Sequence, residues 1–175
     1  MTLLILFLLF VQDNKPEIRI PDLEQQIHKL IDVHRKANDR NSMAWDDTLA
    51  VLARAHSEDM AKRGYFKHVN PEGLSPMKRA EAAGYKSCQL IGENIYQNNL
   101  YSRVITEKKR TTYDWNSMYK IAATTIKGWM DSPSHRQNIL DKNYTGEGIG
   151  IAFGPDDKVY ITQMFCGADA EAQVK

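Results

Sequence analysis

Residues 148–166 read GIGIAFGPDDKVYITQMFC. Large apolar side chains occupy every second position in each half of this stretch, which is the period of a half-buried strand. Between the halves, residues 154–157 (GPDD) form a cluster of turn-forming residues. The stretch therefore predicts an antiparallel hairpin that ends the domain, with Gln163 at an inward-facing position of the second strand.

The chain before this hairpin has helical periodicity. Apolar residues recur every three or four positions in stretches that begin near Leu23, Asp46 and Ala122. Asp46 is a suitable N-cap for the second of these helices, and Gly64 suits the left-handed position that follows its last turn.

Two short helices and one more strand complete the expected elements. Ser75-Pro76 and Ser132-Pro133 each predict a short helix, because each pairs an N-cap residue with proline at the first helical position. Residues 90–98 read as a strand, whereas residues 99–116 are polar and charged and are expected to form an irregular, mobile loop. Helices combined with an antiparallel sheet predict an α+β domain.

Composition limits the class of protein. The 175 residues suit one domain, and 42% hydrophobic with 26% charged residues is ordinary for a soluble globular chain. Lysine and arginine total 23 against 22 acidic residues, a net charge of +1. This balance excludes a broadly basic face, so we expect no nucleic-acid partner.

The N-terminus carries an apolar stretch, residues 3–11, followed by polar residues. Nine residues are too few to cross a bilayer as a helix, so we expect no transmembrane span. The stretch is typical of a secretory signal and predicts export to the cell surface or medium, although a short buried strand or helix is the alternative. The expected organisation is a signal-like segment (1–12), a linker (13–22), one domain (23–167) and a tail (168–175).

The chain has two cysteines, Cys88 and Cys166, and their expected oxidation state depends on whether the chain is exported. In an exported chain an even count favours a disulfide, and in a cytosolic chain it favours two free buried thiols.

Three polar residues stand in unusual settings. Glu93 lies inside an otherwise apolar strand, and His68 and His135 lie in the turns or helix starts at either side of it in the sequence. A buried carboxylate needs partners, which two histidines can supply as a structural hydrogen-bond network. The same residues are also plausible ligands of a divalent metal, or a catalytic site. His56, on the apolar face of its helix, is instead expected to be a core histidine.

Read together, several segments resemble the CAP superfamily of cysteine-rich secretory, antigen 5 and pathogenesis-related proteins, in its prokaryotic branch. They occur in the family's order: residues 45–60, FKHVNPEG at 66–73, GENI at 92–95, GWMDSPSHRQNIL at 128–140, and the final hairpin.

The resemblance implies a three-layer α-β-α sandwich with a small antiparallel sheet between helices. It also implies a cleft lined by two histidines and two acidic residues, at which His68, Glu93 and His135 match three positions. Asp131 and Glu147 are the two candidates for the fourth, and Gln163 is expected to line the same cleft. The fold would bring Cys88 and Cys166 within reach of a disulfide.

Family members are mostly exported, with lipid binding and zinc binding attached to parts of the family. For this chain the resemblance implies Zn²⁺ or another divalent metal bound weakly by His68 and His135, with Glu93 either as a third ligand or, in preference, as the acceptor that orients one imidazole. The expected partners are a small ligand, a lipid or a cell-surface polymer, and the expected state is a monomer.

These features allow three alternative functions. The first is a non-enzymatic extracellular binding module that uses the cleft. The second is a metal-assisted hydrolase or protease with a histidine base, which is disfavoured because no serine or cysteine stands in an activating motif. The third is a structural or interaction protein that uses residues 99–116 on an external partner.

Overall fold

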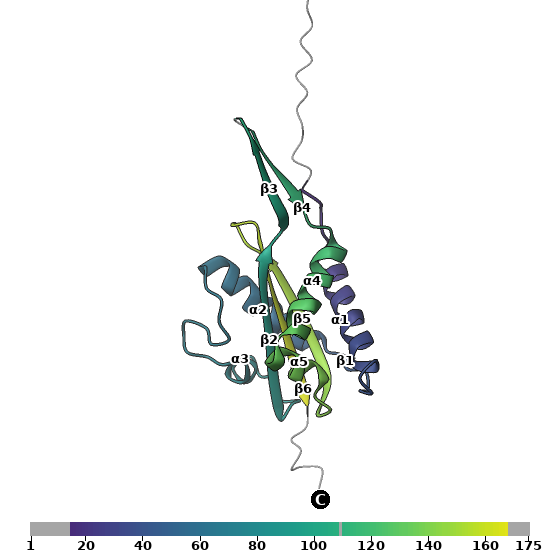
Figure 1. Cartoon of the computed structure of the whole chain (residues 1–175). Helices are drawn as coiled ribbons and strands as arrows, with labels where there is room; N and C mark the ends of the chain where they lie inside the picture. The colour runs from purple at the N-terminus through teal and green to yellow at the C-terminus, as the bar shows by residue number, and fades with distance from the viewer. Residues whose placement is uncertain (1–14, 109, 168–175) are drawn as a thin grey trace, which may run out of the picture.

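The computed structural model describes residues 15–108 and 110–167, whose helices and strands form three layers (Figure 1). The middle layer is a four-stranded sheet in the order β1-β5-β6-β2. Its strands are β1 (Ala44–Trp45), β2 (Leu90–Asn99), β5 (Tyr144–Phe153) and β6 (Lys158–Gly167). Strands β5, β6 and β2 are antiparallel, and β1 joins β5 in parallel.

Helices cover both faces of this sheet. One face packs against α1 (Ile20–Lys36), α4 (Met118–Asp131) and α5 (Pro133–Leu140), and the other against α2 (Asp47–Arg63) and α3 (Pro76–Ala82). The predicted α+β class and three-layer sandwich are confirmed. Among the helices of the described residues, none has the length and apolar character that a membrane span requires.

Helix ends follow the predicted caps closely. The Asp46 carboxylate accepts hydrogen bonds from the backbone nitrogens of Thr48 and Leu49, and Gly64 adopts φ 68° after α2. The Ser75 hydroxyl caps α3 in the same way. One boundary differs, because α1 starts at Ile20, inside the expected linker, with proline in its first turn. The predicted signal-like segment and tail lie outside the described residues.

Strand β5 presents different side chains to the two helical layers. Ile149 and Ile151 enter the larger core, whose other members come mainly from α1, α4 and β6. Gly148 and Gly150 face α2 instead. A Cβ at Gly148 would overlap the backbone nitrogen of Ala50, and one at Gly150 would overlap that of Arg54. Helix α2 therefore lies directly on the backbone of β5, and the two glycines make that approach possible.

Replacing Gly150 with alanine is expected to destabilise the fold by about 3 kcal/mol or to prevent folding, because backbone rather than a flexible side chain must move. Chemical denaturation of the purified variant measures the loss. Gly146→Ala is the matched control, since its Cβ would lie an ordinary 3.6 Å from Cys166 Cβ. Equal stability of the two variants would contradict this account of the α2–β5 contact.

A buried arginine joins the α1 layer to the loops around it. Arg35 is 1% exposed, and its guanidinium donates to the carbonyl oxygens of Asn41, Ile139, Asp141 and Tyr144 over 2.7–3.2 Å. These carbonyls lie in the connection after α1, in and just after the last turn of α5, and at the start of β5. One side chain thus satisfies backbone oxygens at the ends of three elements.

Residues 99–116 are not an irregular loop, and that expectation is wrong. They form a separate two-stranded hairpin, β3 (Tyr101–Glu107) and β4 (Arg110–Trp115). The reason is local, because the threonine, valine, isoleucine, tyrosine and tryptophan of this stretch favour strands, and Lys108 adopts φ 55° at the turn. The hairpin projects beyond the sheet and the helices (Figure 1).

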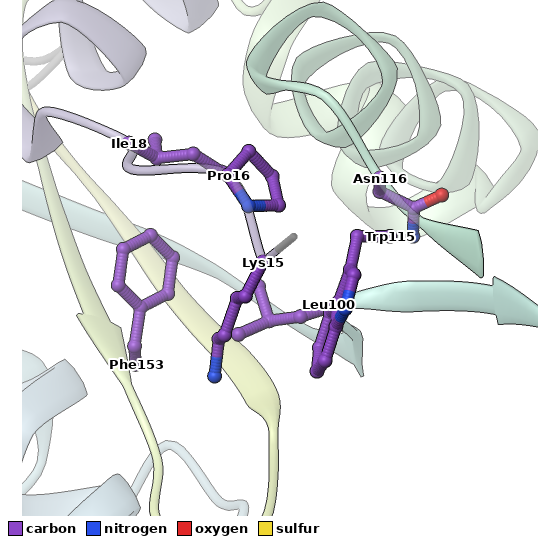
Figure 2. A pocket seen from close by; sticks show the side chains of 7 residues that line it. All are labelled: Lys15, Pro16, Ile18, Leu100, Trp115, Asn116 and Phe153. Atoms are coloured by element: carbon purple, nitrogen blue, oxygen red, sulfur yellow. The ribbon is translucent and has the colours of Figure 1, made fainter. Parts of the chain in front are cut away.

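The base of this hairpin is fixed to the body of the domain. Leu100 N donates to Asp157 O at 2.7 Å, and Asn116 N donates to Leu100 O at 2.8 Å. Beside it lies a cavity of about 260 Å³, with Lys15 and Pro16 between the rings of Phe153 and Trp115 (Figure 2). Its remaining lining residues are Ile18, Leu100 and Asn116.

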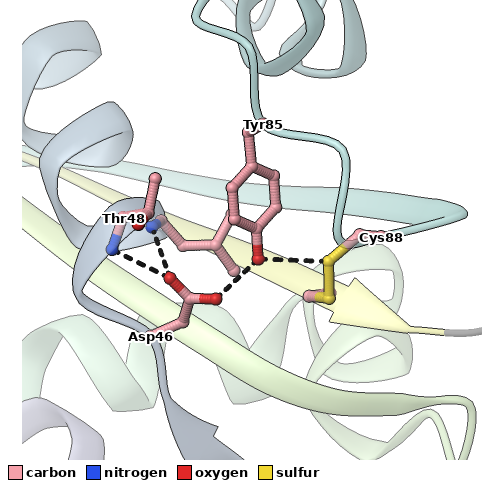
Figure 3. The surroundings of a disulfide bond; sticks show 6 residues. Asp46, Thr48, Tyr85 and Cys88 are labelled. Carbon is pink, nitrogen blue, oxygen red and sulfur yellow. Dashed lines mark hydrogen bonds between the residues drawn. A yellow bond between two sulfur atoms is a disulfide. The ribbon is translucent and has the colours of Figure 1, made fainter.

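The two cysteines form a disulfide, as the family resemblance implies. Cys88 lies two residues before β2 and Cys166 near the end of β6, with their Cα atoms 5.5 Å apart. Tyr85 lies against the bridge, and its hydroxyl donates to the Asp46 carboxylate at 2.6 Å (Figure 3). The disulfide and the cap of α2 are thereby joined through one tyrosine.

Removal of the bridge by Cys88→Ala with Cys166→Ala is expected to cost about 4 kcal/mol, because it closes a loop of 78 residues in the unfolded chain. Urea denaturation of the oxidised wild type and the variant measures this difference. An unchanged free energy of unfolding would show that the disulfide does not stabilise the fold by restraining the unfolded chain.

Candidate functional site

The candidate site forms at the exposed edge of the sheet, where β2 has no further neighbour in the four-stranded order. Glu93 extends from β2 toward the α2–α3 layer. His68 comes from the connection between α2 and α3, and His135 from the first turn of α5 on the opposite layer. The α2–α3 connection and the start of α5 therefore both meet β2 at this edge.

Glu93 is buried and fully paired. Its side chain is 1% exposed, and Oε1 lies 2.8 Å from His68 Nδ1. Arg79, on α3, donates to Oε2. Because a carboxylate only accepts, the proton of His68 is on Nδ1 and Nε2 is left for another partner. The buried charge that the sequence indicates is thus neutralised by Arg79 and used to orient an imidazole.

The connection that carries His68 is held from two sides. Arg79 Nη1 donates to the carbonyl oxygen of His68 at 2.6 Å. His56, which is 2% exposed on α2, binds the carbonyl oxygen of Lys67 at 3.0 Å. His56 is the predicted core histidine, and burial lowers its pKa. Its contact with Lys67 O fixes the residue next to His68.

His135 is positioned through its backbone. Its carbonyl oxygen accepts from Asn94 Nδ2 at 3.1 Å, and Asn94 is the neighbour of Glu93 on β2. Burial lowers the pKa of His135, and the charge of His68 lowers it further. The structure therefore brings His68 and Glu93 into direct contact and favours a neutral imidazole at His135.

Gln163 and Glu147 do not line this site, which corrects that expectation. They are 0% and 1% exposed and lie on the opposite face of the sheet, beneath α1. Gln163 Nε2 donates to Glu147 Oε2 at 2.5 Å, and Glu147 Oε1 binds His28 Nδ1 at 2.5 Å. The physical reason is strand alternation, since Gln163 pairs with Asn94 and not with Glu93.

Asp131 is also not part of the site as described. Its exposed carboxylate pairs with Lys127 one turn earlier on α4. Within residues 15–108 and 110–167, no group of three or more histidine, cysteine or acidic side chains is arranged to hold a metal ion.

Asn94 joins the network of Glu147 and Gln163 to α5. Its amide donates to Gln163 Oε1 at 3.1 Å, and its oxygen accepts from Asn138 Nδ2 at 2.9 Å. Asn138 also reaches the carbonyl oxygen of Glu93 at 3.3 Å. A continuous set of hydrogen bonds thus runs from His28 on α1 along one face of the sheet to the backbone of the Glu93 strand.

Sequence reasoning missed Arg79, Asn138 and the pairing of His28 with Glu147. Arg79 lies one turn after the Ser75-Pro76 helix start, and the buried carboxylate that it neutralises was the only signal for a cation nearby. Nothing in the periodicity of α1 indicated a carboxylate partner for His28.

A cavity of about 390 Å³ lies next to the site. It is lined by residues of α2, α3 and the connection between them, including His56, Asn70 and Arg79. Arg79 thus belongs both to the Glu93 pair and to the wall of this cavity.

Residues 28–165 match the family model described as CAP, the cysteine-rich secretory protein family. This chain belongs to that family, and the family resemblance of its motifs is confirmed.

Two curated Bacillus subtilis proteins are similar to this chain. The membrane protein YlbC is 32% identical over 142 residues, which is 81% of this chain and 34% of YlbC. YkwD is 30% identical over 144 residues, which is 82% of this chain and 47% of YkwD. The chain therefore spans a third to a half of the length of these relatives.

Solved structures agree with the fold. An extracellular SCP-domain protein of Bacillus anthracis is 28% identical with a TM-score of 0.64, over 85% of this chain and 41% of that one. An outer surface protein of Borrelia burgdorferi has a TM-score of 0.68 at 17% identity, over 89% of this chain and 99% of that one, and so shares its fold.

The pairing of His28 with Glu147 gives a pH-dependent contribution to stability. The hydrogen bond from His28 to Glu147 raises the pKa of His28. A raised folded-state pKa stabilises the fold fully below the unfolded value of about 6.5, and this stabilisation is lost as the pH rises through the folded-state value. At pH 5.5, His28→Gln is expected to cost about 1.5–3 kcal/mol, the worth of a hydrogen bond to a charged group, and less at pH 9.

Urea denaturation of both proteins from pH 5.5 to pH 9 measures this difference. His34→Gln changes an imidazole on the same helix outside the network and serves as control. A stability difference between wild type and His28→Gln that does not vary over this range would contradict the assignment.

Proposed function

We propose that this chain is the binding domain of an exported or surface-attached protein, and that its ligand binds without chemical conversion at His68 and His135, beside Arg79. The observation that carries the proposal is the state of Glu93. Both of its carboxylate oxygens are engaged, by His68 and by Arg79. The carboxylate thus orients an imidazole and holds a guanidinium in place, and neither oxygen is left to activate water.

The chemistry of these groups favours a ligand rich in oxygen atoms. The Arg79 guanidinium and the single N–H of a neutral His135 are donors suited to carboxylate, phosphate or hydroxyl oxygens, and His68 Nε2 can accept from a hydroxyl group. The adjoining cavity of about 390 Å³ gives room for the body of a small ligand or for one unit of a surface polymer. His68, with a side chain that is 47% exposed, is accessible from solvent.

Location outside the cytoplasm is part of the proposal. The Bacillus anthracis relative is an extracellular protein and the Borrelia protein an outer surface protein. The apolar stretch at residues 3–11 and the disulfide support the same location for this chain.

A metal-assisted hydrolase is the second candidate, and the His68–Glu93 pair favours it, since an imidazole oriented by a carboxylate is the usual form of a general base. Two further observations weigh against it. Ser134, the hydroxyl beside His135 in the sequence, contacts Ser132 Oγ at 3.4 Å. Arg79 also occupies Glu93 Oε2, so this carboxylate is not free to serve as a third metal ligand.

The donor set does not fit a closed zinc site. Such a site normally uses four protein ligands, whereas only the two imidazoles are available here. His68 Nε2 and His135 would hold a loosely bound divalent ion, with Glu93 as the acceptor that orients His68. Such an ion would supply a Lewis acid that anchors an oxygen atom of the ligand.

Zinc uptake tests the site. His68→Ala combined with His135→Ala is expected to abolish zinc binding in calorimetry at pH 7.5, and to change the free energy of unfolding in chelator by no more than about 1 kcal/mol. Wild-type binding should weaken as the pH falls and the imidazoles protonate. His34→Ala is the control and should bind zinc as the wild type does.

Two results would contradict the proposal. If chelation unfolds the wild type, the metal is structural. If the double variant binds zinc like the wild type, the ligand site lies elsewhere. Turnover of peptide or ester substrates that disappears in His68→Ala would favour the hydrolase.

A further inference from the structure

The projecting hairpin of β3 and β4 has two solvent-facing sides. Val104 pairs with Tyr113 and Tyr101 with Trp115, so these four side chains share one side, here called the aromatic side. The centre of the Tyr101 ring lies 5.0 Å from that of Tyr113 and 5.9 Å from that of Trp115. Val104 extends this cluster toward the turn and is 45% exposed.

Ile105 lies on the other side of the hairpin and is 41% exposed. Trp115 packs against the domain core at the base, whereas adjacent aliphatic residues exposed on both sides show that the outer half of the hairpin does not pack on the body of the domain. A two-stranded hairpin is marginally stable in water by itself. An apolar environment around its outer half would therefore stabilise it.

Positive charge is concentrated in the same hairpin. Residues 101–115 contain four basic and two acidic side chains, a net charge of +2, whereas the whole chain has +1. Lys108 and Arg110 lie at the turn. The acidic residues near the base are neutralised, because Asp156 pairs with Lys158 and Asp157 with Lys15.

The chain enters the described structure at the base of this hairpin. Lys15 Nζ lies 4.9 Å from the centre of the Trp115 ring. Residues 12–14 are all that separate Lys15 from the apolar stretch at residues 3–11. The apolar stretch and the hairpin are thus connected to the same end of the domain.

We propose that the hairpin of β3 and β4 contacts the surface of an anionic lipid bilayer, with Val104 and Ile105 at the lipid boundary and Lys108 and Arg110 at the headgroups. Exposed aliphatic residues, tyrosine and tryptophan, and a basic end are together the composition of interfacial membrane contacts. Each basic side chain near an anionic surface adds to the attraction.

Pairing with a second copy of this chain is the other way to cover the open strand edges. Charge disfavours it, because two hairpins of the same positive charge would be brought side by side. The lipid surface has the opposite charge and also covers both aliphatic residues. The contact is separate from the His68–His135 site, and its failure would leave the proposed function unaffected.

Vesicle flotation of the full chain tests the contact, with vesicles of phosphatidylcholine alone or with 30% phosphatidylglycerol as the two probes. We expect the wild type to bind the anionic vesicles more tightly, and this preference to weaken at high salt. Lys108→Glu with Arg110→Glu is expected to reduce binding to anionic vesicles at least about tenfold, since two attractions become repulsions. Val104→Ser with Ile105→Ser should weaken binding to both kinds of vesicle.

Lys29→Glu with Lys86→Glu is the matched control, because both lysines are exposed and lie outside the hairpin. Near-ultraviolet circular dichroism shows whether each variant keeps the folded core. Equal binding of the Lys108→Glu, Arg110→Glu variant and the control variant to anionic vesicles would overturn the proposal. A dimer of the wild type in solution that Val104→Ser with Ile105→Ser dissociates, without vesicle binding, would overturn it in favour of a second copy.

Discussion

The close approach of α2 to β5 is the constraint on which the rest of the structure depends. Because Gly148 and Gly150 carry no side chains, the helix lies on the strand backbone and the sheet is thin at this point. The direction of α2 then sets where its C-terminal end emerges. The connection that follows passes β2 at the sheet edge, which is why His68 reaches Glu93 although 25 residues separate them in the sequence.

The sheet keeps its two sets of buried polar groups on opposite faces. Glu93 is neutralised from α3 by Arg79, and Glu147 is paired from α1 by His28 and hydrogen-bonded by Gln163. Each carboxylate has the partners that burial requires. Asn94, the neighbour of Glu93 on β2, hydrogen-bonds Gln163 of the second set and the backbone of α5, so the edge strand that carries the candidate site is also held by the opposite layer.

Much of the architecture could be predicted from local sequence. Asp46, Gly64 and Ser75 set helix ends because capping is decided by neighbouring residues. The disulfide and the meeting of three segments at the sheet edge came from the order of the family's motifs, which contains long-range information that spacing lacks.

Other features were out of reach for identifiable physical reasons. The alternation of Gln163 with its neighbours showed that its side chain is buried but could not show against which helix. The hairpin of β3 and β4 was missed because a register shift between Tyr101 and Arg103 breaks the alternation along β3. Partners such as Arg79 depend on tertiary contact alone.

The position of the disulfide determines what a proteolytic cut in the hairpin does to the domain. The segment between residues 88 and 166 contains β2, β3, β4, α4, α5, β5 and most of β6, and so includes the projecting hairpin, whose turn is open to cleavage. A single cut at that turn leaves both fragments joined covalently through sulfur. Strand β2, which begins just after Cys88, and strand β6, which contains Cys166, also remain paired along their length. The domain can therefore be cut at this turn and still keep His135, in the C-terminal fragment, joined to His68 and Glu93 in the N-terminal fragment.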